Sequence, residues 1–499
     1  MRFAVAALGC FIATLAPARA GDSQANLDAL LRRVRSAAGE PYRYHVRGTA
    51  RESAAPGVRI ETDAEGSRRR VRRCAGELCS GTYEDGAALW LTDLNDTAVP
   101  GEPLDPRRVS LRAIENYAFA DPDFAKRGGR VDALPPLVAS DGRSLLRVAV
   151  TAPQGATLEA LIDPATGLVA GARGRGIAVD YTDQSEIGSG VTVPFEIAAG
   201  DNVERFEERA IDPEALSAPR GLVPRFASPS ASLPFAGGEG HDADPIVECV
   251  VAGARVPCLL DTGNSGMAIS LELIERLGLE PLTDSFRIQG LGAYETGVVR
   301  VPELRVGTAS YPPAYYAVLH DMHAYGYDIV LGTDAFAHAR ITLDYPAHRV
   351  AIEPEAAQAA AGGVPIEFEG FLPVVPVELG ATAARLTIDT GDESAVNLSR
   401  EFYRLHPQIF TPNASSEVAG IGGQGEELLG TIARVDLGGF ALLKQPIGTT
   451  NRSLPTAQGH LGSGALRHFV VTFDYAHHNL SLRPRDGDPA VVSSSAAPR

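Results

Sequence analysis

The sequence of 499 residues predicts a mainly β protein in which an α+β region precedes two copies of one β unit. Two observations lead to this fold class. Four short motifs occur twice between residues 245 and 484, in the same order and at nearly constant spacing. In addition, most apolar runs alternate with polar residues and end at Gly, Pro or Asp, which is typical of short antiparallel strands.

The first residues are typical of a secretory signal peptide. Arg2 gives a positive start, residues 3–16 are apolar, and Ala-Arg-Ala at 18–20 is a small-residue cleavage site. Cys10 follows Ala-Leu-Gly, as in a lipoprotein box, but it comes too early in the apolar stretch, so cleavage after Ala20 is the interpretation we adopt. The apolar stretch is too short for a transmembrane helix, and no later stretch qualifies. We expect a periplasmic or secreted protein.

The composition is acidic. With 62 acidic and 45 basic residues the formal charge is −17, and removal of Arg2 and Arg19 would make it −19. This balance argues against nucleic acid as the main partner, because phosphate binding needs a positive field. The basic run at 67–73 is interpreted as a solvated strand. His320 and His323 have helical spacing for a metal, but no third ligand is evident, so we expect neither a metal nor another cofactor.

The region 21–228 predicts an α+β domain. Residues 23–39 form an amphipathic pattern, and strand-like runs broken by Gly, Asp and Pro follow between 42 and 197. The order of one helix and then an antiparallel sheet weakly resembles periplasmic lipoprotein-carrier domains. A linker rich in small residues is expected over 229–244.

Four cysteines remain after cleavage, in two close pairs, Cys74 with Cys79 and Cys249 with Cys258. An even count in an exported chain favours disulfides, although small buried thiols are the alternative. If the hairpin around Cys249 turns between Gly253 and Ala254, Cys249 and Cys258 lie directly opposite each other on paired strands.

The repeated unit begins with a carboxylate on a tight turn. Asp261-Thr262-Gly263 follows two leucines, and Asp389-Thr390-Gly391 follows Thr-Ile 128 positions later (389 − 261). Three further segment pairs match in the same order: 288–297 with 418–427, 329–336 with 459–466, and 341–354 with 471–484. We therefore expect β units at 245–354 and 372–484, a linker at 355–371 and a disordered tail at 485–499. Short helices are expected at 270–278 and 399–406.

Residues 245–484 resemble the retroviral-protease-like (pepsin-type) aspartic peptidases, duplicated within one chain. In that family each half supplies an apolar–apolar–Asp-Thr/Ser-Gly loop, a glycine-rich flap hairpin and a later apolar–apolar–Gly segment that braces the loop. All three elements occur twice here, in the family order. The resemblance implies a duplicated acid-protease β-barrel that forms a pseudo-dimer within one chain, and a monomer that acts on peptide or protein substrates.

The resemblance also implies the site residues. Asp261 and Asp389 would be the catalytic pair, because two close carboxylates share one proton and can serve as base and acid toward a water molecule. The supporting residues are Thr262, Gly263, Thr390 and Gly391 in the loops, Gly290, Gly292, Gly420, Gly422 and Gly423 in the flaps, and Gly332 and Gly462 in the bracing segments.

The sequence departs from the family pattern around both loops. Asn264 and Asp392 stand where Ala or Ser is usual, and Asp392 and Glu393 add carboxylates near the site. The second loop is one residue longer before its strand, and Gly464 stands opposite Asp334 of the first unit. Asp392 either faces the catalytic pair and disfavours loss of its shared proton, or points into solvent. The function predicted is that of an exported aspartic endopeptidase. The alternative is a peptide- or protein-binding module that has lost catalysis on the same fold.

Overall fold

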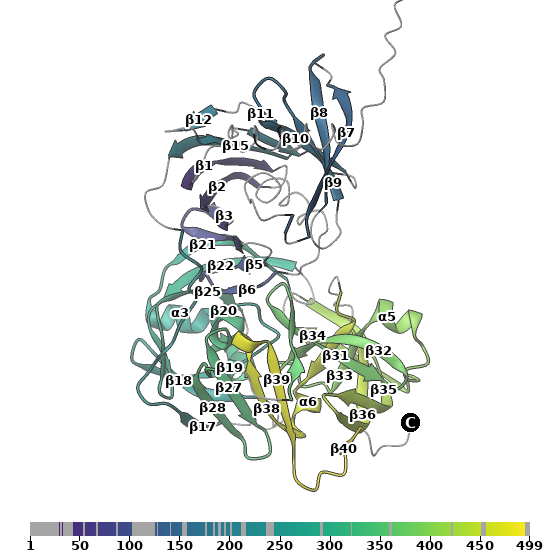
Figure 1. The fold of residues 1–499 in the computed structure, drawn as a ribbon. Coiled ribbons are helices and arrows are strands. Elements are labelled where there is room, and N and C mark those ends of the chain that lie inside the picture. Colours follow the sequence, from purple (N-terminus) through teal and green to yellow (C-terminus); the bar gives the residue numbers. More distant parts are fainter. Residues whose placement is uncertain are drawn as a thin grey trace, which may run out of the picture. The chain divides into compact units, whose positions relative to one another are not determined.

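The computed structural model shows a protein built mainly of β-strands (Figure 1). It describes residues 43–52, 55–65, 68–85, 88–101, 128–139, 141–151, 157–174, 177–182, 185–187, 191–193, 196–199, 202–210, 216–235, 244–289, 293–320, 322–358, 362–420, 423–450 and 456–494, together with 29, 32, 125 and 126. The predicted signal peptide lies outside these residues. Of the helix predicted over 23–39, only Ala29 and Arg32 are described, and both are helical. No helix of the described part has the length and apolar character needed to cross a membrane.

The chain divides into two compact units, and the division does not follow the predicted boundary at residue 228. The first unit holds residues 1–69 and 104–216, and the second holds 70–103 and 217–499. Strand β3 (Arg68–Ala75) runs through the point of division. The exact domain limits given above stay predictions.

The first unit is an antiparallel sheet with neighbouring strands in the order β2-β1-β15-β14-β11-β10-β9-β8-β7. The strands are β1 (Arg43–Glu52), β2 (Ala55–Glu65), β7 (Arg130–Val138), β8 (Ser144–Thr151), β9 (Thr157–Ile162), β10 (Val169–Gly174), β11 (Ile177–Thr182), β14 (Glu196–Ala199) and β15 (Asn202–Ala210), with a separate hairpin of β12 (Ser185–Ile187) and β13 (Val191–Val193). Val148, Val150 and Leu158 are buried where β8 and β9 pair, so alternation along the strands gives this sheet its apolar face.

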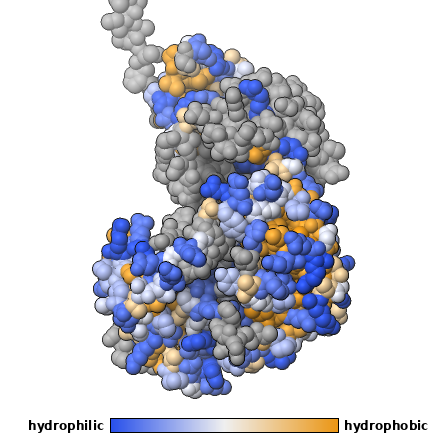
Figure 2. Space-filling view, turned by 180° about the vertical axis from the view of Figure 1, so that it is seen from behind, coloured by the Kyte–Doolittle hydropathy of each residue, from blue (hydrophilic) through white to orange (hydrophobic). Residues whose placement is uncertain are grey.

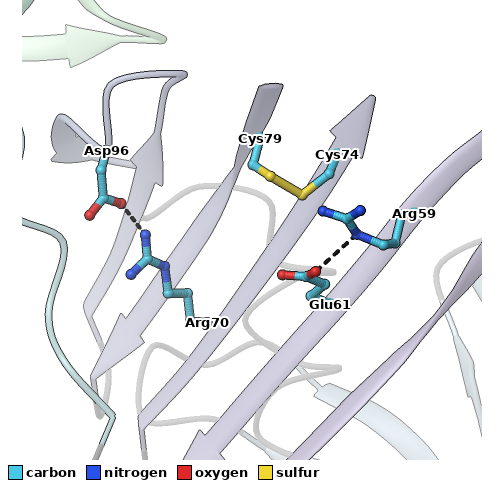
Figure 3. The surroundings of a disulfide bond; sticks show 6 residues. All are labelled: Arg59, Glu61, Arg70, Cys74, Cys79 and Asp96. Carbon is cyan, nitrogen blue, oxygen red and sulfur yellow. Dashed lines mark hydrogen bonds and ion pairs between the residues drawn. A yellow bond between two sulfur atoms is a disulfide. The ribbon is translucent and has the colours of Figure 1, made fainter. Parts of the chain in front are cut away.

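The second unit begins with strands from the N-terminal region. After β3 come β4 (Leu78–Asp85), β5 (Ala88–Thr92) and β6 (Ala98–Pro100), each paired with the next. A disulfide joins Cys74 of β3 to Cys79 of β4, as Figure 3 shows. Val99 of β6 is buried in the same hydrophobic core as the two β units that follow, so these strands are part of that core.

Residues 245–354, called the first half below, build most of a ten-stranded sheet. Its order is β16-β24-β23-β18-β19-β26-β20-β25-β22-β21. The bounds are β16 (Arg225–Phe226), β18 (Ile246–Val251), β19 (Ala254–Leu260), β20 (Met267–Ser270), β21 (Pro281–Gln289), β22 (Ala293–Val301), β23 (Leu304–Val306), β24 (Ala309–Tyr311), β25 (Ala314–Leu319) and β26 (Ile329–Leu331). The 3-10 turn η2 (Met322–Tyr325) lies between β25 and β26.

Residues 372–484, called the second half, build most of a nine-stranded sheet. Its order is β30-β31-β32-β37-β33-β36-β35-β34, and β40 also pairs with β36. The bounds are β30 (Glu367–Glu369), β31 (Leu372–Leu379), β32 (Thr382–Asp389), β33 (Val396–Ser399), β34 (Ala414–Gly420), β35 (Gly423–Leu437), β36 (Phe440–Thr450), β37 (Gly459–Gly462) and β40 (Val491–Ser493). The prediction of a disordered tail from 485 is wrong as far as residue 494, because β40 hydrogen-bonds to β36.

The central strands of the two halves are arranged alike. In the first half β19 runs parallel to β26, which is antiparallel to β20, which is parallel to β25. In the second half β32, β37, β33 and β36 follow the same order with the same directions. The arrangement brings the ends of β19 and β32, and therefore the two Asp-Thr-Gly loops, into corresponding positions.

A six-stranded sheet contains strands of both halves, and β27, β28, β38 and β39 lie side by side in Figure 1. Its order is β17-β28-β27-β38-β39-β29, with β17 (Ala231–Pro234), β27 (Ala339–Asp344), β28 (Arg349–Pro354), β29 (Val364–Pro365), β38 (Phe469–Asp474) and β39 (Asn479–Pro484). Thr342 and Thr472, which correspond in the repeated motif, are direct partners with hydroxyls 2.9 Å apart. Phe336 and Phe473 meet edge to face at 5.4 Å, so the halves share one core.

The predicted helices at 270–278 and 399–406 form as α3 (Leu271–Leu277) and α5 (Arg400–Leu405). Each begins after a serine whose hydroxyl accepts a backbone N–H three residues on, Ser270 from Leu273 at 3.1 Å and Ser399 from Phe402 at 3.2 Å. Three shorter turns are α4 (Thr333–Phe336), α6 (Ser463–Leu466) and the 3-10 helix η3 (Tyr475–His477).

The β18–β19 hairpin corrects one prediction. The turn consists of Ala252 and Gly253, with φ of 48° and 82°, one residue earlier than predicted. A two-residue turn of this kind needs positive φ at both positions, and Gly253 meets that need best as the second turn residue. Cys249 therefore lies opposite Val256, and its disulfide to Cys258 runs diagonally, with Cα atoms 6.0 Å apart.

The surface of the second unit is mixed in polarity. On the face drawn in Figure 2, hydrophilic side chains predominate, and apolar side chains gather mainly toward one side. This balance is ordinary for a globular protein, because polar surface is too scarce to cover a sphere.

Candidate active site

The two Asp-Thr-Gly loops lie at the ends of paired strands. Asp261 follows β19, and its N–H donates to the carbonyl of Leu331 in the parallel neighbour β26 at 2.9 Å. Asp389 is the last residue of β32, opposite Gly462 in the parallel neighbour β37. Each carboxylate is thus placed by a buried strand whose register is fixed by a second strand.

The threonines tie the loops together. The N–H of Thr262 donates to Oγ1 of Thr390 at 3.0 Å, and the N–H of Thr390 donates to Oγ1 of Thr262 at 3.1 Å. Each hydroxyl also donates across to the other half, Thr262 to the carbonyl of Ile388 and Thr390 to the carbonyl of Leu260, both at 2.7 Å. Both threonines are fully buried, so these hydrogen bonds are shielded from water and hold the loops rigidly.

The carboxylates of Asp261 and Asp389 face each other's loops. A Cβ added to Gly263 would lie 2.2 Å from Oδ1 of Asp389, and one added to Gly391 would lie 2.7 Å from Oδ2 of Asp261. Only glycine leaves room for this approach. Each Oδ1 also accepts the N–H of the glycine in its own loop, at 2.8 Å for Asp261 and 3.2 Å for Asp389. Each carboxylate therefore lies against the glycine of the opposite loop.

The predicted bracing glycines contact the loops directly. A Cβ on Gly332 would lie 2.1 Å from the carbonyl of Gly266, and one on Gly462 would lie 2.2 Å from the carbonyl of Ser394. The next residues complete the contact, because the N–H of Thr333 donates to the carbonyl of Asn264 at 3.0 Å and that of Ser463 to the carbonyl of Asp392 at 2.7 Å.

The predicted flap glycines are only partly described. Gly290, Gly292 and Gly422 lie outside the described residues. Gly420 and Gly423 pair with each other where β34 and β35 meet. The corresponding strands β21 and β22 of the first half also pair, up to Gln289 opposite Ala293.

Asp392 forms an ion pair, and the interpretation that it points into solvent is wrong. Its Oδ2 contacts Nε2 of His460, and its Oδ1 accepts the N–H of Ser394 at 2.7 Å. Burial alone would raise the pKa of Asp392, but the hydrogen bond and the positive charge of His460 outweigh burial and lower the pKa to about 2. At neutral pH Asp392 is therefore ionised and held beside the loop of Asp389.

Two more polar residues lie near this ion pair, and sequence reasoning missed them. Asn397 of β33 donates from Nδ2 to Oε1 of Glu427 at 2.6 Å. Burial, and after it the charge of Asp392, raise the pKa of Glu427. The only signal in the sequence was His460 itself, which replaces Val330 of the first half within the matched bracing motif.

The first half places an aromatic residue near the loops. Tyr327 packs against the buried residues Ala268, Leu319, Met322 and Val330. Burial raises the pKa of Tyr327, and the charge of Asp261 adds to this shift more than that of Asp389. Tyr327 is a further residue that the sequence motifs did not indicate.

No metal site emerges from the described residues, which hold no cluster of three His, Cys, Asp or Glu side chains suited to an ion. His323 instead contacts Oδ1 of Asp328 through Nδ1 at 3.0 Å. Asp328 also accepts from the Ser270 hydroxyl at 3.0 Å. These contacts give His323 a structural role at the start of α3.

A family model described as aspartyl protease matches residues 247–335. The match contains the Asp261 loop and the bracing Gly332, and it supports an aspartic protease. The comparison with curated proteins found no match. Among solved structures, the crystal structure of a LolA superfamily protein from Nitrosomonas europaea is 12% identical and covers 38% of this chain and 94% of its own, with a TM-score of 0.29. A TM-score this low does not establish a shared fold.

Proposed function

We propose that this protein is an exported aspartic endopeptidase whose dyad consists of Asp261 and Asp389, one from each of two tandem units that form a pseudo-dimer. The observation that carries the proposal is the contact of each carboxylate with the glycine of the other loop. Two carboxyl groups that serve as base and acid must together hold one proton, and like charges placed close together favour such sharing.

The proposed chemistry follows from that shared proton. The ionised carboxylate accepts a proton from a water molecule, which attacks the carbonyl carbon of the scissile peptide. The protonated carboxylate donates a hydrogen bond to the carbonyl oxygen, and a proton then passes to the leaving amine. The hydrogen bonds between Thr262 and Thr390 keep the two carboxyl groups in position during these transfers.

Export is supported by the cysteines and by the predicted signal peptide. Cys74–Cys79 and Cys249–Cys258 are disulfides. Structural disulfides persist in oxidising compartments, which favours a location outside the cytoplasm. We propose that the mature chain begins at residue 21 and acts as a monomer, because one chain supplies both aspartates and both halves share one core.

A digest of a peptide library by the purified full chain tests the proposal. We expect cleavage that pepstatin inhibits and that Asp389→Asn removes. Binding of library peptides without cleavage would instead favour a binding module on the same fold. A chain that neither binds nor cuts peptides under acidic or neutral conditions would contradict both proposals.

A further inference from the structure

The bracing segment of the first half carries a buried carboxylate whose counterpart in the second half is Gly464. Asp334 of α4 has no exposed surface, and its Oδ2 lies 3.5 Å from the place that a Cβ on Gly266 would occupy. The carboxylate therefore sits against the active-site loop that follows Asp261. A buried carboxylate is costly unless it is hydrogen-bonded or protonated. Its partners therefore indicate what it does.

The main partner is Asn95, which lies 239 positions earlier in the chain. Nδ2 of Asn95 donates to Oδ2 of Asp334 at 2.7 Å and to the carbonyl of Tyr315 at 2.9 Å. Its Oδ1 accepts the N–H of Tyr315 at 2.7 Å. The amide of Asn95 thus pairs with β25 as a neighbouring strand would, and it uses its remaining N–H for Asp334.

The loop that contains Asn95 is held in its conformation by its own hydrogen bonds. It connects β5 and β6, and Oδ1 of Asp93 accepts the N–H groups of Asn95 at 2.9 Å and Thr97 at 2.8 Å. Asp96 takes a positive φ of 61° and pairs with Arg70. These bonds hold the loop in one conformation, so Asn95 loses little conformational entropy when it hydrogen-bonds to Asp334.

Asp93 adds a second carboxyl group to this contact. Burial, the charge of Asp334 and a hydrogen bond with Asp334 raise the pKa of Asp93 well above its usual value. Among the described residues no hydrogen-bond donor reaches the buried Oδ1 of Asp334. An O–H on Asp93 would supply this missing donor. The other titratable groups facing this pair are the buried Tyr316, whose pKa rises through burial and the charge of Asp334, and Tyr311 behind it.

We propose that Asn95 and Asp93 are positioning residues of the active site, which hold Asp334 and thereby the loop of Asp261. The hydrogen bond from Asn95 holds Asp334. The adjoining Thr333 in turn donates its N–H to the carbonyl of Asn264, in the loop of Asp261, at 3.0 Å. This inference rests on the proposed peptidase function. It makes the strands 70–103 part of the catalytic unit, and it explains why the first bracing segment has Asp334.

Two measurements on the full chain test this inference: peptide cleavage, and hydrogen exchange of the segment 258–270, corrected for the intrinsic effect of pH. Asn95→Ala should lower kcat about tenfold to a hundredfold with little change in KM, because the loop moves out of the reacting geometry. It should also raise exchange in this segment. Glu77→Ala is the control, since it truncates an exposed side chain of the same segment, in the turn between β3 and β4.

Asp93 has its own variant. Asp93→Asn keeps an acceptor for the loop and offers a permanent N–H to Asp334. In the wild type, exchange of 258–270 should increase as rising pH removes the proton of Asp93, at a higher pH than for an ordinary aspartate because the pKa of Asp93 is raised, and in Asp93→Asn it should stay constant. The inference is overturned if Asn95→Ala behaves like Glu77→Ala, or if Asp93→Asn keeps the wild-type pH dependence. If the wild type cuts nothing, the peptidase proposal fails, whereas the exchange data still decide whether these residues hold the loop.

Discussion

The two halves of the second unit agree at the loops and differ immediately behind them. Beside the first loop, Ala268 pairs with Val330 within a small apolar cluster. At the corresponding place beside the second loop, Asn397 pairs with His460, which binds Asp392. At this position one half therefore has apolar side chains and the other has an ion pair.

This difference separates two kinds of constraint. The residues that bring the carboxylates together recur in both halves, because the approach leaves no room for a Cβ at either loop glycine. The position beside each loop needs only to be packed and electrostatically satisfied, so it is filled by an apolar pair in one half and by an ion pair in the other. Symmetry of the fold therefore does not make the roles of Asp261 and Asp389 equal.

The largest expected effect tests what the halves share. Asp261→Asn and Asp389→Asn should each lower kcat by a factor of about 10² to 10⁴, because either change removes a group that moves protons. Thermal unfolding should shift little, since asparagine can still accept the N–H of Gly263 or Gly391. Steady-state cleavage and calorimetry check this. Activity that survives either change would contradict the dyad.

The second effect tests where the halves differ. His460→Val installs the residue of the first half and leaves the Asp392 carboxylate without its cation. We expect about 3 kcal/mol lower free energy of unfolding, because an unpaired charge remains in a poorly hydrated place. Adding Asp392→Asn, which places the residue of Asn264 in the second loop, should recover most of the lost free energy of unfolding.

A double-mutant cycle by urea unfolding measures this coupling. The matched control is Val330→Ala in the first half, which removes apolar volume without leaving a charge and so should not be rescued by Asn264→Ala. Equal losses for His460→Val alone and for its double variant would show that the ion pair is not what stabilises this loop.

Much of this arrangement could be predicted from the sequence, because the repeated motifs are local. Two Asp-Thr-Gly turns at matching places in two matching units imply two loops that meet, and the strand pairing agrees with that expectation. The role of residues 70–103 could not be predicted. Asn95 and Asp334 are far apart in the chain, and nothing in their neighbourhoods indicates that they meet. The register of the Cys249 hairpin could not be predicted either, because it depends on Ala252 adopting a positive φ in the turn.

A third prediction concerns acid stability. The pKa of Asp392 is lowered from 3.8 to about 2 in the folded protein. Its contribution to stability is therefore present above about pH 4 and is lost as the pH falls from about 4 to about 2, by roughly 2 kcal/mol. Urea unfolding of the wild type should show this loss, and Asp392→Asn should lack it. Parallel pH curves for the two proteins would show that Asp392 titrates normally.

The smallest expected effect concerns the extra residue in the second loop. A Cβ on Gly464 would lie 2.6 Å from the carbonyl of Glu393, which is a contact with backbone that cannot yield easily. Gly464→Ala should therefore lower the free energy of unfolding by about 1 kcal/mol or slightly more. Gly266→Ala in the shorter first loop is the control, since its Cβ would meet nothing closer than 3.5 Å. If removal of Glu393 makes Gly464→Ala harmless, the longer loop is the reason that the second bracing segment has glycine where the first has Asp334. Equal costs for both alanine variants would contradict this explanation.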